Sequence, residues 1–141
     1  MIQQIQDRFA IEDVLIRYTR AIDTGEWDRL DEVFTPDARI DYTASGGIEG
    51  DLATVKPWLA ENLPIFPSRM HSLHQIAIDH DGPDEARVAA YFHNPMTLPQ
   101  GDGKPDLLVE FGGIYHHVFT RTPDGWRSRH LHEQICWKRG L

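Results

Sequence analysis

The sequence predicts an α+β fold in which helices cover one face of a mostly antiparallel sheet. Its first part has apolar residues at helical spacing, and from Met70 onward apolar and polar residues alternate as they do in strands. Long strands that follow one another directly pair through hairpins and form an antiparallel sheet. Amphipathic helices ahead of such a sheet can bury their apolar stripes against its concave face.

The first helix is expected between Ile5 and Ile22. Its apolar stripe consists of residues three and four positions apart, namely Ile5, Phe9, Ile11, Val14, Leu15, Tyr18 and Ile22. Gly25 breaks this helix, and a second short helix is expected around Trp27, Leu30 and Phe34 before Pro36 stops it.

A third helix is expected to run from Thr54, as its capping residue, to about Asn62. Pro57 fits its first turn, where no backbone N–H is needed. The expected strands are Arg39–Thr43, Met70–Asp79, Ala86–Leu98, Leu107–Arg121 and Trp126–Trp137. Turns rich in glycine, proline and aspartate separate the later strands.

Length and charge limit the classes of function. The 141 residues are expected to form a single domain, 1–141, and the net charge of −8 argues against nucleic acid or an anionic membrane as a partner. No apolar run approaches the ~20 residues that span a bilayer, and no signal peptide is recognised. Cys136 is the one cysteine, so a reducing, cytoplasmic location is expected.

Asp23 is unusual because it lies in the last turn of the first expected helix. The helix dipole is negative there and disfavours a carboxylate. This carboxylate is therefore either solvated or paired with a cationic or hydrogen-bonding group from another part of the fold.

The same stretch resembles the opening signature of SnoaL-like domains, a branch of the nuclear transport factor 2-like superfamily that includes scytalone dehydratase and bile acid dehydratase. The resemblance lies in Tyr18, Asp23, Trp27, Leu30, Phe34, Pro36 and Tyr42, and continues in Met70–Gln75, Gly112–His117 and Arg121–Arg127. It implies a cone-shaped fold with a pocket between helices and sheet. Because this scaffold serves many chemistries, the motifs specify the fold better than the substrate.

The resemblance implies that His71 is the partner of Asp23. An imidazole that donates one N–H to a carboxylate presents its other nitrogen as an oriented base. His74 competes for this role, but it would point to the other face of a regular strand. The alternative is that Asp23 and His71 are both ordinary surface residues.

Two tyrosines are candidates for donating a hydrogen bond to a developing oxyanion. Tyr18 could reach the pocket beside the dyad, or it could be a core aromatic of the first helix. Tyr42 occupies a context similar to that of a pocket tyrosine in scytalone dehydratase. The chain departs from that enzyme at Ile22, since the enzyme has a further tyrosine immediately before its aspartate.

His116 and Trp27 complete the expected substrate-binding residues. The resemblance puts His116 where related enzymes have a polar pocket residue, although a structural histidine is equally compatible with the sequence. Trp27 belongs to the signature. In the strand that contains His116, alternation separates one set of residues (Leu108, Glu110, Gly112, Ile114, His116 and Val118) from Phe111, Tyr115, His117 and Phe119 on the opposite face.

We expect no metal and no cofactor. His130 and His132 share a strand face, but a metal site needs three or four converging ligands, and Glu133 points away from that face. No glycine-rich nucleotide motif and no activated thiol environment is recognised.

The expected function is a cofactor-independent lyase of the dehydratase type acting on a small, apolar cyclic substrate such as a polyketide, steroid or aromatic. His71 would remove a proton next to a carbonyl, Asp23 would hold the imidazole, and Tyr18 would bind the enolate oxygen. Loss of hydroxide or halide completes an elimination. Isomerase or cyclase activity, or ligand binding alone, remains open.

A homodimer or homotrimer through the outer sheet face is also expected. We expect that face to carry five large apolar residues, which would leave too much apolar surface on a monomer: Phe111, Tyr115, Phe119, Ile135 and Trp137.

Overall fold

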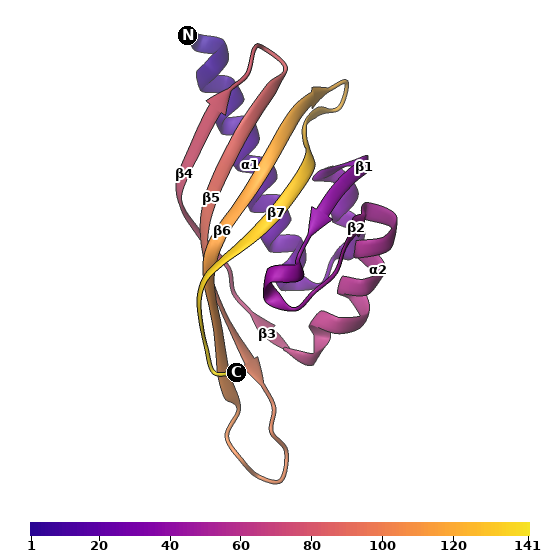
Figure 1. The fold of residues 1–141 in the computed structure, drawn as a ribbon, viewed down its shortest axis with the longest axis vertical. Coiled ribbons are helices and arrows are strands. Elements are labelled where there is room, and N and C mark those ends of the chain that lie inside the picture. Colours follow the sequence, from indigo (N-terminus) through magenta and orange to yellow (C-terminus); the bar gives the residue numbers. More distant parts are fainter.

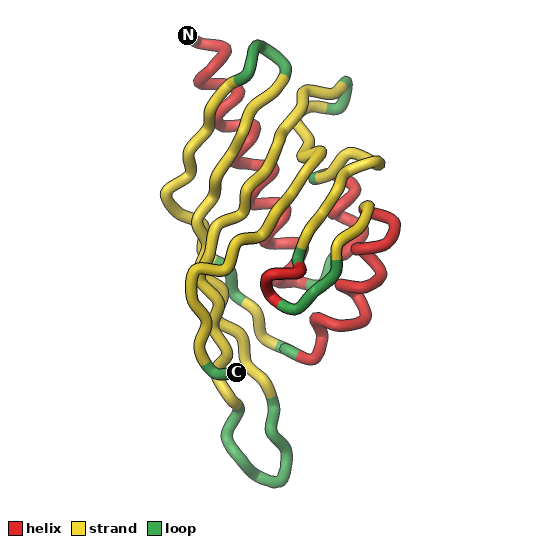
Figure 2. Tube along the Cα trace, viewed as in Figure 1, coloured by secondary structure: helices red, strands yellow, loops and turns green.

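Helices cover one face of a curved, mixed sheet of seven strands in the computed structural model, which describes residues 1–141 (Figures 1 and 2). The α-helices are α1 (Ile2–Thr24) and α2 (Leu52–Asn62), and the 3₁₀ helices are η1 (Trp27–Glu32), η2 (Thr43–Ser45) and η3 (Leu63–Ile65). The strands are β1 (Phe34–Asp41), β2 (Glu49–Asp51), β3 (Ser68–Arg69), β4 (Ser72–His80), β5 (Glu85–Leu98), β6 (Leu107–Thr122) and β7 (Gly125–Arg139). The α+β fold predicted from the sequence is confirmed.

Helix α1 lies along the sheet (Figure 1) and buries its apolar stripe against it. It begins at Ile2, three residues before the expected start. It ends at Thr24, and Gly25 caps it with a left-handed φ of 74° and an N–H that donates to the carbonyl oxygen of Ala21. Asp23 therefore lies in the last turn, as expected.

The segment after Gly25 differs from the expectation in one respect. The short helix η1 ends at Glu32, and Phe34 begins strand β1, so this strand starts five residues before Arg39. Pro36 lies within β1 at an irregularity of its parallel pairing with β7, between Phe34 and Arg39. A proline fits there because it has no N–H to donate to a ladder.

Helix α2 is capped one turn earlier than expected. The Asp51 carboxylate accepts a hydrogen bond from the Thr54 backbone N–H at 2.9 Å, so Asp51 is the capping residue and Thr54 lies inside the helix. Because α2 begins at Leu52, Pro57 is its sixth residue and lies in the second turn, not in the first turn as expected.

Three long strands form the centre of the sheet, whose order is β2-β1-β7-β6-β5-β3, with β4 also paired to β5. The β5–β6 hairpin extends beyond the helices at one end (Figure 1). The expected strand Met70–Asp79 begins two residues later, as β4, and Met70 and His71 connect it to the short strand β3 that precedes it. This break places His71 at the end of α1. No helix has the length and apolar character that a membrane span requires.

The two faces of the sheet are the reverse of the expected assignment. Tyr115 and Phe119 are buried in the core under the helices, and Phe111 and Ile135 pack against the same core. Only Trp137 of the expected outer set is half exposed. Alternation correctly predicted which residues of β6 share a face, but it does not tell which face meets the helices.

The reversed faces remove the argument for assembly through an apolar surface. The outer face instead carries histidines and other polar groups, including His116, which bonds Gln134, and His132, which bonds Asp41. The homodimer or homotrimer stays a prediction that rests on the resemblance alone.

Candidate active site

A cavity of about 280 Å³ lies between the helices and the inner face of the sheet. Of its 19 lining residues, 13 are hydrophobic, so the cavity suits a small and largely apolar molecule. Its apolar wall includes Leu59, Phe66, Phe92, Met96 and Phe111. The polar side chains among its lining residues come from elements far apart in the sequence.

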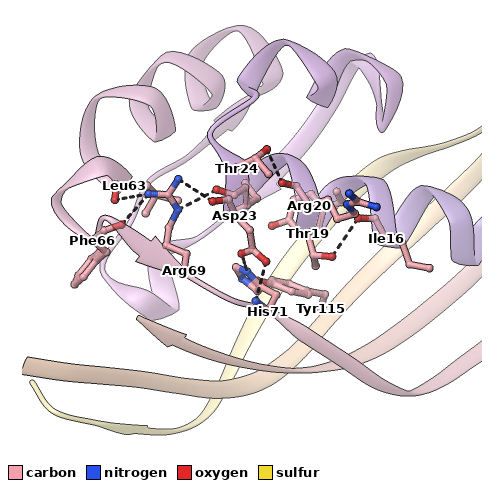
Figure 3. A network of polar contacts seen from close by, with 12 residues as sticks. Ile16, Thr19, Arg20, Asp23, Thr24, Leu63, Phe66, Arg69, His71 and Tyr115 are labelled. Atoms are coloured by element: carbon pink, nitrogen blue, oxygen red, sulfur yellow. Dashed lines mark hydrogen bonds and ion pairs between the residues drawn. The ribbon is translucent and has the colours of Figure 1, made fainter. Parts of the chain in front are cut away.

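His71 lines this cavity and contacts Asp23 at the end of α1 (Figure 3). The Asp23 carboxylate accepts the His71 backbone N–H on Oδ2 at 2.9 Å, and its Oδ1 lies 2.5 Å from His71 Nδ1. The His71 side chain is only 3% exposed and that of Asp23 is 20% exposed. Two contacts to one carboxylate fix the ring orientation and make Nδ1 the protonated nitrogen, so Nε2 is left as the acceptor.

Arg69 lies at the carboxyl end of α1, next to Asp23 (Figure 3). Its guanidinium donates to the main-chain oxygens of Ile22 at 2.9 Å and Asp23 at 3.4 Å, and of Leu63 at 3.1 Å and Phe66 at 2.8 Å. A cation at the carboxyl end of α1 offsets the negative helix dipole, which would otherwise disfavour the Asp23 carboxylate.

Tyr115 contacts the free nitrogen of the dyad. Its hydroxyl lies 3.1 Å from His71 Nε2, and its ring stacks on Phe92 with 4.1 Å between centroids. Burial, with the charge of Glu133 as a further cause, raises the pKa of Tyr115 well above its ordinary value. The hydroxyl therefore stays protonated and donates to Nε2.

Tyr18 and Tyr42 form a directly hydrogen-bonded pair at the same cavity. Burial raises the pKa of each hydroxyl well above its ordinary value, so both keep their protons. One hydroxyl donates to the other, which leaves one proton of the pair for an oxygen atom of a ligand. Ile22 also lines the cavity.

Glu133 and Asn94 complete the polar lining. Glu133 is 7% exposed and Asn94 is 8% exposed, and neither Glu133 Oε1 nor Asn94 Oδ1 has a hydrogen-bond partner. Burial raises the pKa of the Glu133 carboxyl to about 7, the Asp41 carboxylate adds to this shift, and the nearby Ser45 hydroxyl opposes it.

Other expected site residues lie elsewhere. Trp27 is outside the cavity. The Arg69 guanidinium carbon lies over the Trp27 ring, 5.6 Å from the ring centroid. His116 lies on the outer face, 6.2 Å from the ring of His132. His74 is exposed and packs against Tyr91. The structure thus brings together Tyr18, Asp23, Tyr42 and His71 but not Trp27 or His116.

No group of at least three histidine, cysteine, aspartate or glutamate side chains converges in the structure. His132 instead contacts Asp41, with 3.3 Å between Nδ1 and Oδ2.

Sequence reasoning missed Tyr115, Glu133 and Asn94 as cavity residues. Glu133 lies two residues from both Leu131 and Ile135, so alternation puts it on the same strand face as these apolar residues. Burying a charged side chain there is costly without a partner, which is the sequence pattern that could have identified it. Alternation along β6 does not show which face points inward, so the sequence gives no signal that Tyr115 reaches the cavity.

Comparison with known proteins identifies the family. The family model described as "SnoaL-like domain" matches residues 3–132. An uncharacterized protein of Mycobacterium tuberculosis is 41% identical over 98% of this chain and 91% of its own length. A Gibberella zeae protein assigned as a cyclase is 27% identical over 86% of this chain and 87% of its own length.

Solved structures agree in fold. A Kribbella flavida protein has a TM-score of 0.86 at 25% identity, covering 96% of this chain and 95% of that chain. A Novosphingobium aromaticivorans protein assigned to the scytalone dehydratases has a TM-score of 0.85 at 18% identity, covering 99% and 90%. The hexachlorocyclohexane dehydrochlorinase of Novosphingobium barchaimii has a TM-score of 0.84 at 15% identity, covering 99% and 93%. The neighbours also include a member of the nuclear transport factor 2-like superfamily from Salmonella enterica. Because the family model matches residues 3–132 of the 141 in this chain, the chain belongs to the SnoaL-like family.

Proposed function

We propose that this protein is a cofactor-independent lyase that eliminates a small leaving group from a small, apolar cyclic ketone. The observation that carries the proposal is the double contact between Asp23 and His71 at the wall of the cavity. It leaves His71 Nε2 as an oriented proton acceptor next to an enclosed apolar space, which is the arrangement that general base catalysis requires.

In the proposed reaction, Nε2 of His71 removes a proton from the carbon next to the substrate carbonyl. Asp23 stabilises the imidazolium that forms. The Tyr115 hydroxyl gives up its 3.1 Å contact with Nε2 when the C–H group approaches, and it is then free to donate to a substrate oxygen.

The Tyr18–Tyr42 pair is the proposed donor to the enolate oxygen. Because both hydroxyls stay protonated, the pair supplies one hydrogen bond aimed at developing negative charge in a largely apolar space. Departure of the leaving group from the neighbouring carbon then forms the double bond.

The size of the cavity favours a substrate of one or two rings over a steroid. Its volume of about 280 Å³ lies near the lower end of the ~300–1,000 Å³ that ligand pockets usually enclose. An aromatic or polyketide-like ring system therefore fits the proposal better than a four-ring skeleton does.

Two relatives support elimination chemistry and one supports an alternative. The dehydrochlorinase and the protein assigned to the scytalone dehydratases share this fold. The Gibberella zeae relative is assigned as a cyclase, and the same base could form an enolate that attacks a second carbonyl or is protonated elsewhere. Cyclase or isomerase activity is thus the second candidate.

The test uses the α-tetralone that carries a hydroxyl β to its carbonyl, since its elimination product is the strongly absorbing α-naphthol. We expect the wild type to accelerate this reaction above buffer and His71→Ala to lose at least ~10²-fold of that rate. His74→Ala is the matched control and should retain the rate. An equal loss in both variants would remove His71 from its role, and tight naphthol binding without turnover would point to a binding module.

A further inference from the structure

Glu133 is the only acidic side chain among the cavity-lining residues, and the proposed proton abstraction does not use it. It is 7% exposed, and its Oε1 has no hydrogen-bond partner. A buried polar atom left without a partner costs about 1–3 kcal/mol. A ligand in the cavity that hydrogen-bonds Glu133 Oε1 would offset this cost.

The position of Glu133 relates it to the proposed base. In the β6–β7 ladder, Glu133 lies directly opposite Tyr115, and the Tyr115 hydroxyl lies 3.1 Å from His71 Nε2. Side chains directly opposite on one sheet face have Cβ atoms ~4.5–5.5 Å apart. Glu133 and His71 therefore both neighbour one tyrosine, so a single small substrate can reach both.

We propose that Glu133, in its carboxylic-acid form, donates a proton to a hydroxyl group that leaves the substrate. The leaving group is then water, and the substrate class is a cyclic β-hydroxy ketone rather than a halogenated compound. This inference rests on the proposed lyase function.

The surroundings of Glu133 suit an acid. The groups that face it are the Tyr18 hydroxyl from α1, the Tyr42 and Ser45 hydroxyls that follow β1, the Asp41 carboxylate and the Tyr115 hydroxyl from β6. None of these is a cation, and only the hydrogen bond from the Ser45 hydroxyl favours the charged form. Burial raises the pKa of Glu133 to about 7, so the acid form is substantially populated at neutral pH.

The chemistry balances without a further reactant. The substrate's C–H electrons form the new C=C bond while its proton moves to His71 Nε2. The C–O bond breaks, its electron pair goes to oxygen, and the Glu133 proton converts the departing hydroxide to water. The imidazolium of His71 then returns a proton to the Glu133 carboxylate through solvent.

The need for an acid distinguishes two leaving groups. Hydroxide is a strong base and leaves readily only when it is protonated, whereas chloride leaves as a stable anion. A carboxylic acid at this place therefore accelerates loss of hydroxyl and contributes little to loss of chloride.

The experiment compares two α-tetralones that carry either a hydroxyl or a chlorine β to the carbonyl, because both yield α-naphthol. Glu133→Gln should lose ~10²-fold on the hydroxyl compound and at most about threefold on the chlorine compound. His71→Ala should lose both activities. Glu110→Gln is the matched control, since Glu110 is equally buried but pairs with His93 and Arg139 outside the cavity.

A second readout is the pH profile of the two wild-type rates. The ratio of hydroxyl to chlorine turnover should fall above pH about 7, as Glu133 ionises, and should become flat in Glu133→Gln. Equal losses on both compounds in Glu133→Gln, or no loss on either, would overturn the role of Glu133 while leaving the His71 result intact. A wild-type protein that accelerates neither reaction above its rate in buffer would instead overturn the lyase function.

Discussion

Arg69 closes the carboxyl end of α1 by donating from Nε to the main-chain oxygen of Ile22 at 2.9 Å. The last carbonyl groups of a helix have no partner within the helix, and their negative potential disfavours a carboxylate nearby. Arg69 satisfies them and leaves the Asp23 side chain free to bind His71. The helix end thus becomes a support for the dyad.

Replacing Arg69 should therefore affect both stability and activity. Arg69→Leu leaves the carbonyl oxygens of Ile22, Leu63 and Phe66 without their donor, and we expect the free energy of unfolding to fall by about 2–4 kcal/mol. Turnover should fall because Asp23 loses its support. Urea unfolding measures the first effect. Arg129→Leu, which breaks the exposed pair with Glu85, should change stability by less than about 1 kcal/mol.

Asp23 and His71 should behave as one unit. Asp23→Asn and His71→Ala are each expected to lower kcat by at least ~10²-fold, and the double variant should lose little more than either single variant. The reason is that the carboxylate acts only through the ring it orients. Independent roles would instead give a double variant whose loss equals the product of the two single losses.

Stability should depend on pH through His117. Burial lowers the pKa of this imidazole to about 3, whereas a histidine in the unfolded chain titrates near its ordinary value of 6.5. Between these two pH values the unfolded state binds a proton that the folded state does not. Stability is therefore fully present above pH 6.5 and falls as the pH drops toward 3, at most by about 1.4 kcal/mol per pH unit.

The measurement is urea unfolding of the wild type and His117→Phe between pH 4 and 8. The variant should have a shallower acid slope, because its side chain takes up no proton on unfolding. Parallel pH profiles of the two proteins would show that His117 does not contribute to the acid dependence.

Phe119 and His116 lie on opposite faces of β6, so substituting them should have different effects on stability. Phe119 is fully buried in the core, so Phe119→Ala should cost about 3–5 kcal/mol of unfolding free energy. His116 lies on the outer face, so His116→Ala should change stability by less than about 1 kcal/mol and leave turnover intact. A large loss of activity in His116→Ala would restore the role that the sequence suggested.

Chelation is expected to leave the activity unchanged. His130 and His132 do not converge with a third ligand, and His132 instead pairs with Asp41. Turnover should survive dialysis against a strong chelator. Activity that is lost on chelation and restored by one equivalent of zinc or iron would contradict this expectation.

The sequence by itself predicted the main helices, the long strands and the contact between Asp23 and His71, but not the short strands β2 and β3. The apolar stripe from Ile5 to Ile22 predicted α1, and alternation after Met70 predicted the long strands, because these periods follow directly from backbone geometry. Asp23 was recognisable because a carboxylate at a helix end needs a partner, and the resemblance to SnoaL-like domains supplied His71 as that partner.

Only the tertiary structure decided which sheet face meets the helices. Alternation is symmetrical, since it separates Tyr115 from His116 without saying which of them points inward. The positions of Arg69, Tyr115 and Glu133 depend on contacts between elements distant in the chain, namely α1, β3, β6 and β7. No local pattern encodes such contacts, because they depend on how the whole sheet curves and packs around the cavity.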